Sequence, residues 1–238
     1  MGDLTERYLR AVAAIGYGDL DLLPAVLSRA CVDVLPVDGA GISLTGALRV
    51  PLGASGDEVR AGERLQSTLG EGPCLAAAGA GEPLVADQGD IAARWPLFHR
   101  ELTVQTPYRS VVSLPIGATA ERPIGALDLY FRAPEADRSM LRAEVQREVV
   151  DEIARLLLVP LADHAAQEPS DPRWLESPPV RRRMHVWAAV GMLMAAGRQN
   201  EADSLAALRG YAFSHGESLD DLAEAVTARE IDVLELVS

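Results

Sequence analysis

The sequence contains no lysine. All 22 basic residues are arginine, and 35 carboxylates bring the formal net charge to −13. A protein that binds nucleic acid without a specific site needs a positive surface to meet the phosphates. The charge balance therefore excludes a generic nucleic-acid binder and favours, at most, a local RNA site.

Cysteine is also scarce, since Cys31 and Cys74 are the only two in 238 residues. Two are too few for a disulfide framework in a chain of this length. The four histidines show no metal-ligand spacing, so we expect no metal site. No apolar run reaches the ~18 residues of a membrane span, and the N-terminus lacks the pattern of a signal peptide. We expect a cytoplasmic protein that contacts neither membrane nor DNA.

Catalytic motifs are missing as well. The sequence has no Gly-x-Ser-x-Gly, no glycine loop with a lysine for phosphates and no His-Glu-x-x-His. We therefore expect no catalytic residues, no enzyme activity and no cofactor. The sequence leaves open whether the protein binds an unknown small molecule.

What is present is a hydrophobic fraction of 48%, ample for a packed core. Apolar spacing and breakers predict helices over 5–16, 21–35, 97–105 and 139–161, and a short helix or a connection over 57–69. Strands are expected over 40–45, 48–52, 83–86, 110–116 and 124–131. In the last strand Leu127, Leu129 and Phe131 alternate with Asp128 and Tyr130, which is typical of a central strand.

The expected helix over 139–161 carries a narrow apolar stripe that includes Leu141, Val145, Val149 and Ile153. Such a stripe packs on a sheet or pairs with a second chain, so we expect a homodimer through it. Proline-rich sequence then predicts a linker over 167–179 between a first domain, 1–166, and a second, 180–238.

Three helices are expected in the second domain, beginning near residues 179, 200 and 218. Asn200 and Ser218 each precede an acidic residue by three positions, which is a pattern typical of helix N-caps. Gly197 and Gly216 mark the ends of the first two helices.

Ordered landmarks between residues 70 and 130 make the first domain resemble a GAF domain. They are Gly70-Glu71-Gly72-Pro73-Cys74, Asp87, Arg94-Trp95-Pro96, Arg109-Ser110, Pro115 and Gly125-Ala126-Leu127-Asp128-Leu129-Tyr130. The resemblance implies an α+β fold, with helices on one side of an antiparallel sheet and a ligand-sized pocket on the other. Candidate sensor-pocket residues are Cys74, Trp95, Tyr108, Arg109, Asp128 and Tyr130.

The second domain resembles an ANTAR domain, a small all-α three-helix module that binds RNA and promotes transcription antitermination. The resemblance rests on Ala189-Val190-Gly191-Met192-Leu193-Met194, Leu208-Arg209, Leu219 and Leu222-Ala223. It implies binding to structured RNA, such as stem-loops. Candidate RNA-binding residues are Arg181, Arg182, Arg183, Ala189, Gly191, Arg198, Arg209 and Tyr211.

Two functional hypotheses follow. The first is an RNA-binding antitermination regulator with an N-terminal sensor or dimerisation domain. The second is a small-molecule or redox sensor of the same fold that acts through protein contacts. The first is the function that we expect. Val190 stands where the family has lysine, and the region from residue 171 onward has seven arginines against eleven carboxylates, which supports the second as the alternative.

Overall fold

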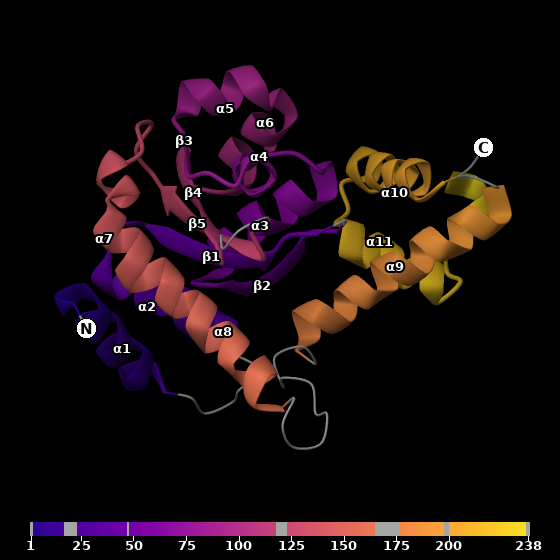
Figure 1. The fold of residues 1–238 in the computed structure, drawn as a ribbon. Coiled ribbons are helices and arrows are strands. Elements are labelled where there is room, and N and C mark those ends of the chain that lie inside the picture. Colours follow the sequence, from indigo (N-terminus) through magenta and orange to yellow (C-terminus); the bar gives the residue numbers. More distant parts are fainter. Residues whose placement is uncertain are drawn as a thin grey trace.

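The structure is a computed structural model that describes residues 2–16, 23–46, 48–117, 123–164, 177–197 and 200–236. A sheet covered by helices forms the larger part, and three helices beside it form a smaller module (Figure 1). This arrangement confirms the expected α+β domain followed by an all-α module. No helix among the described residues is long and apolar enough to cross a membrane.

The sheet is antiparallel throughout, with the strand order β2-β1-β5-β4-β3. Its strands are β1 (Gly39–Leu44), β2 (Val50–Ala54), β3 (Leu84–Ala86), β4 (Ser110–Ile116) and β5 (Gly125–Phe131). Strand β5 lies in the centre and is buried along its whole length, as its alternating sequence predicted.

One face of the sheet packs against α1 (Asp3–Ile15), α2 (Leu23–Val34) and α8 (Asp151–His164) (Figure 1). Successive strand residues point to opposite faces, so Leu127 and Leu129 join this apolar core while Tyr130 joins a different one. The alternation read from the sequence is confirmed.

The opposite face is covered by α3 (Asp57–Leu69) and α4 (Pro73–Ala80), with α5 (Gln88–Arg94) and α6 (Pro96–Gln105) beside them. The GAF resemblance implied helices on one side of the sheet and a ligand-sized pocket on the other. The structure corrects that expectation, because helices lie on both sides and buried polar side chains fill the space below α3.

The expected continuous helix over 139–161 is wrong in detail. A 3₁₀ turn (Arg138–Leu141) leads into α7 (Ala143–Val145), a π-helical turn (Gln146–Val150) and then α8. Val145, Val149 and Ile153 are buried in the chain's own core. This part of the stripe therefore packs inside its own chain and is not available to a second one. The predicted homodimer would need another surface.

The smaller module consists of α9 (Pro178–Gly197), α10 (Glu201–His215), α11 (Leu219–Thr227) and a 3₁₀ turn (Val233–Leu236). Both predicted N-caps are confirmed, since the side chains of Asn200 and Ser218 accept hydrogen bonds from the third residues of their helices. Of the predicted linker, 167–176 lie outside the described residues, and α9 begins within its last positions.

The module packs directly on the GAF-like part. Leu48, just before β2, is 4% exposed and belongs to the core that α9, α10 and α11 share. The hydroxyl oxygen of Thr68 on α3 accepts a hydrogen bond from the backbone N–H of Leu219 at the start of α11, at 3.1 Å. The two parts are therefore joined by both apolar and polar contacts.

Candidate functional sites: a buried ion network and an interdomain cleft

A network of polar side chains lies between the sheet and the helices α3 and α4. The odd positions of β4 and the even positions of β5 point toward α3, which places Ser113 and Asp128 there. On α3, Glu63 and Gln66 lie three residues apart and share one helix face. All four side chains are buried.

Arg49 is the centre of this network and is 2% exposed. Its Nη2 lies 2.5 Å from Glu63 Oε2 and 3.2 Å from Asp128 Oδ2. Its Nη1 donates to the Glu63 carbonyl oxygen at 2.8 Å and to Ser67 Oγ at 3.2 Å, and its Nε donates to Cys74 Sγ at 3.0 Å. All three guanidinium nitrogens are therefore hydrogen-bonded without water, which is the condition for burying arginine.

The remaining bonds close the network. Gln66 Nε2 donates to Asp128 Oδ2 at 2.8 Å, and Ser113 donates to Asp128 Oδ1 at 2.6 Å. The Tyr130 hydroxyl donates to Glu63 Oε1 at 2.7 Å. A satisfied network of this kind rigidifies the core around it.

Glycine at two positions lets the backbone approach these side chains. A Cβ on Gly41 of β1 would lie 2.6 Å from Glu63 Cδ, so only glycine leaves room for the carboxyl group. Gly72 has φ +136°, a backbone conformation that favours glycine. It precedes α4, where the N–H of Cys74 donates to Gln66 Oε1 at 2.9 Å.

One arginine faces two carboxyl groups in this network, so it can balance only one of them. Burial, together with the nearby negative charge of Asp128, raises the pKa of Glu63 to about 8, although the attraction of Arg49 lowers it. Burial alone would lower the pKa of Arg49, but the attraction of Cys74, Glu63 and Asp128 raises it well above its usual range. Arg49 therefore stays charged, and Glu63 keeps its proton at neutral pH.

This proton predicts a pH dependence of stability. Between pH 4.5, the ordinary pKa of Glu63, and about 8, the folded chain holds a proton that the unfolded chain has released. The free energy of unfolding contributed by this group therefore falls as the pH rises through that window. Urea midpoints of the wild type and of Glu63→Gln should coincide below about pH 4.5 and separate progressively up to about pH 8, with the variant the more stable. A constant difference across the range would contradict a protonated Glu63.

Cys74 does not have the lowered pKa that a redox sensor needs. It is fully buried, and burial raises its pKa to about 12, against the attraction of Arg49. Cys31 is also fully buried, and burial likewise raises its pKa to about 12. Both side chains are thiols at neutral pH, and a thiol reacts far more slowly than a thiolate.

We therefore expect neither cysteine of the native chain to react with dithionitrobenzoate at neutral pH. Both should react in urea, because unfolding removes the burial that suppresses the thiolate. Absorbance of the released thionitrobenzoate measures this directly. A native thiol that reacts within minutes would restore the redox form of the sensor hypothesis.

The structure places one of the other predicted sensor residues beside the network and two away from it. Tyr108 packs on Tyr130, with ring centroids 5.0 Å apart, and so borders the network. Trp95 packs in the core beside α5 and α6, under the guanidinium of Arg94 at 4.4 Å. Arg109 donates to the carbonyl oxygens of Thr106 and Tyr108, away from the network.

Of the predicted RNA-binding arginines, two are engaged inside the module. Arg182 pairs with Asp221 and with Glu224 on α11. Arg183 is 2% exposed and its Nη2 donates to Asp220 Oδ2 at 3.0 Å. Arg181 is exposed and makes no ion pair with the described residues. The three consecutive arginines therefore do not form one basic surface.

The remaining predicted RNA-binding residues are scattered. Ala189 is buried in the module core, whereas Gly191 is exposed. The guanidinium of Arg209 lies against Gly70, at the end of α3. Tyr211 stacks on His215, with ring centroids 4.0 Å apart. The predicted Arg198 lies outside the described residues.

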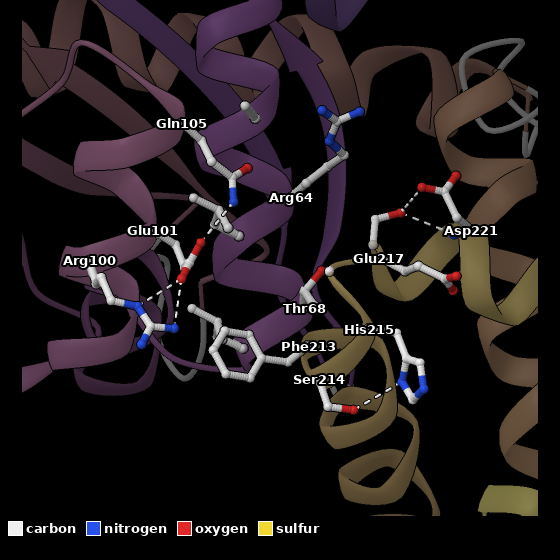
Figure 2. Close-up of a pocket in the computed structure, with 15 residues that line it drawn as sticks. Arg64, Thr68, Arg100, Glu101, Gln105, Phe213, Ser214, His215, Glu217 and Asp221 are labelled. Carbon is white, nitrogen blue, oxygen red and sulfur yellow. Dashed lines mark hydrogen bonds and ion pairs between the residues drawn. The ribbon is translucent and has the colours of Figure 1, made fainter.

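A cleft of about 690 Å³ opens between the GAF-like part and the module. Figure 2 shows Arg64, Thr68, Arg100, Glu101 and Gln105 on one side of it and Phe213, Ser214, His215, Glu217 and Asp221 on the other.

Charges of both signs line this cleft. Glu101 pairs with Arg100 and accepts a hydrogen bond from Gln105, and the Arg100 guanidinium lies 5.7 Å from the Phe213 ring. Arg64 is exposed and makes no ion pair within the described parts of the chain. The cleft therefore suits a small polar molecule better than an apolar one.

One sequence family and two solved structures are similar to this chain. The sequence model of the GAF domain family matches residues 20–161. Among solved structures, a GAF domain from an Acinetobacter phosphoenolpyruvate-protein phosphotransferase is similar at 14% identity and a TM-score of 0.47, covering 72% of this chain and 100% of that chain. A GAF domain of a phosphoenolpyruvate-protein phosphotransferase from Coxiella burnetii is similar at 17% identity and a TM-score of 0.46, covering 68% of this chain and 97% of that chain. No curated protein matches the chain. Because the family match spans more than half of its residues, the chain belongs to the GAF domain family.

Proposed function

We propose that the protein is a signal-dependent regulator in which the GAF domain controls the position of the three-helix module. The observation that carries this proposal is the adjacency of Leu48 and Arg49. Leu48 is part of the module core, and Arg49 is the centre of the buried network. A rearrangement that displaces the backbone at Arg49 would also displace Leu48, because consecutive Cα atoms are only ~3.8 Å apart.

Helix α3 supplies a second connection between the buried network and the three-helix module. Its Glu63 and Gln66 belong to the network, while Thr68 bonds to the start of α11. A rigid helix that contacts a network at one face and a partner at another can transmit a rearrangement. A small polar molecule in the interdomain cleft would contact both parts and would stabilise the docked arrangement.

In this proposal the output is a contact that the module makes with another protein. The paired arginines of α9 support a protein partner over nucleic acid. Arg182 and Arg183 are balanced by Asp221, Glu224 and Asp220, so they add little positive potential outside the module.

Hydrogen exchange of the full chain tests the coupling. Asp128→Asn keeps the side-chain shape but removes a charge from the network. We expect it to increase amide exchange in α10 and α11 as well as in the sheet. Glu58→Gln, which removes an exposed carboxylate from helix α3, is the control for the loss of one negative charge and should change neither. If Asp128→Asn changed exchange only within the GAF domain, the proposed control of the module would be overturned.

RNA binding with transcription antitermination is a second candidate. The order and caps of α9, α10 and α11 support it through their resemblance to an ANTAR domain, and Arg181 is exposed without an ion pair among the described residues. Base contacts would come from the loops of hairpins, since duplex RNA is hard to read by side chains.

Fluorescence anisotropy of labelled RNA hairpins with the full chain tests this candidate. Binding should weaken as salt rises, and Arg181→Ala should weaken it while Arg60→Ala, an exposed arginine on α3, should not. The absence of binding to a diverse hairpin pool at low salt would remove the candidate.

A further inference from the structure

The contact between the module and the GAF domain contains a buried ion pair. Arg183 near the start of α9 and Asp220 near the start of α11 are 2% and 8% exposed, and Arg183 Nη2 donates to Asp220 Oδ2 at 3.0 Å. Helix α9 contacts β2 of the GAF domain. The backbone N–H of Leu219, next to Asp220, donates to Thr68 on α3. The pair therefore lies where the two parts meet.

This pair is incompletely hydrogen-bonded. Arg183 Nε and Nη1 and Asp220 Oδ1 are buried and have no hydrogen-bond partner among the described residues. Each such group loses its bonds to water on burial and gains none in return. The buried Arg49 differs, since all three of its guanidinium nitrogens are bonded. Burial of the Arg183–Asp220 pair therefore opposes the docking of the module.

Like charges around Arg183 add to this cost. Burial lowers the pKa of Arg183, and the attraction of Asp220 raises it. The charges of Arg49, Arg209 and Arg182 lower the pKa further. Arg49 belongs to the GAF domain and Arg183 to the module, so their repulsion acts between the two parts. Separation of the module from the GAF domain relieves it.

We propose that the Arg183–Asp220 pair is a release device, which keeps the docked module easy to separate from the GAF domain. Leu48 and Thr68 hold the module in place, whereas the buried pair opposes them. When the module separates, Arg183 and Asp220 stay together on α9 and α11 and regain water at their unpaired atoms. Apolar side chains at the two positions would dock without this loss. The pair therefore lets a modest signal release the module.

The release device rests on the function proposed above, in which the module changes its position relative to the GAF domain. It adds the part of the contact that makes this change possible. The two proposals can fail separately. Exchange in Asp128→Asn asks whether the buried network moves the module, whereas the test of the release device replaces no residue of the network.

The backbone amide of Leu219 reports the contact directly. Leu219 is the first residue of α11, where an N–H has no carbonyl partner within the helix, and its bond to Thr68 comes from the GAF domain. Exchange of this amide with solvent deuterium, followed by nuclear magnetic resonance of the full chain, therefore measures how often the module separates. Amides in the interior of α10 measure the stability of the module itself.

The test replaces the pair by apolar side chains in the variant Arg183→Met/Asp220→Leu. Exchange at Leu219 should slow at least about fivefold, because removal of the unpaired groups favours docking. Arg183→Met alone should speed it, since Asp220 then stays buried without a cation. The matched control is Arg182→Met/Asp221→Leu, the neighbouring pair on the same two helices. Its side chains are 39% and 57% exposed, so this variant should not slow the exchange.

An exchange rate at Leu219 that stays the same or rises in Arg183→Met/Asp220→Leu would contradict the release device. If exchange slowed only in the interior of α10, the pair would act within the module alone, and the proposal would again be wrong. Circular dichroism checks that the helices remain formed. Arg183→Leu/Asp220→Met repeats the test with a second apolar pair if the first variant does not fold.

Discussion

Replacement of Arg49 by methionine is expected to lower the free energy of unfolding by about 3–5 kcal/mol, the usual cost of removing one partner of a buried ion pair. Methionine is close to arginine in length but has no charge. Without the guanidinium, Asp128 keeps the bonds from Gln66 and Ser113 but has no cation beside it. The Glu63 carbonyl oxygen also loses a donor. Urea denaturation followed by circular dichroism measures the change as a shift of the midpoint.

Arg132→Met is the control for this prediction. Arg132 pairs with Glu58 at 3.4 Å, and both side chains are more than half exposed. Its loss should cost less than about 1 kcal/mol. Adding Asp128→Asn to Arg49→Met should recover part of the stability, because it removes the uncompensated charge. Equal effects of Arg49→Met and Arg132→Met would show that the network contributes little.

The second large effect is expected for Leu48→Ala. Truncation of a buried leucine costs about 2–5 kcal/mol, and Leu48 lies in the core of a module to which it does not belong in sequence. The loss should therefore fall on the docking of α9, α10 and α11 rather than on the sheet. Hydrogen exchange should show faster amide exchange in these helices, while the central strand β5 keeps its protection.

Leu97→Ala is the matched control, because it removes the same atoms from a leucine on α6 that is 43% exposed. It should leave exchange in the module unchanged. A Leu48→Ala chain that lost protection in β5 and in the module to the same extent would show that the two parts unfold as one unit and that docking is not a separate step.

Much of the fold could be predicted from local sequence. The strand over 110–116 has the bounds that its sequence predicts. Residues 57–69, predicted as a short helix or a connection, form a helix with these bounds. Asn200 and Ser218 cap the helices that they were expected to cap. These features depend on interactions within a few residues, which the sequence displays directly.

The network could be predicted only in part. Cys74, Asp128 and Tyr130 were named because they fall within family landmarks. Arg49 and Glu63 were not, since Arg49 precedes a short strand and Glu63 looks like an ordinary helix carboxylate. They lie 79 and 65 residues from Asp128 in sequence. The pairing of β2 with β1 and of β1 with β5, together with the packing of α3 on the sheet, brings the three together. The spacing of Glu63 and Gln66 on one helix face was the available signal.

The three consecutive arginines of α9 show what helix geometry can predict and what it cannot. Consecutive residues point about 100° apart on a helix, so three arginines in a row cannot share one environment. The structure gives them three: Arg181 is exposed, Arg182 is half-buried beside two carboxylates, and Arg183 is buried. Helix geometry indicates that the three surroundings differ. The positions of the α11 carboxylates determine which of the arginines form ion pairs.

The π-helical turn at Gln146–Val150 has a consequence for comparing this chain with its relatives. A π turn holds one residue more than an α turn. Both Val149 and Val150 of this turn are buried. The positions after it are therefore displaced by one residue from those of an uninterrupted helix. An alignment of this chain with a GAF domain that lacks the turn needs a one-residue gap here. Without the gap, every equivalence along α8, including that of Ile153, would be assigned to the wrong side of the helix.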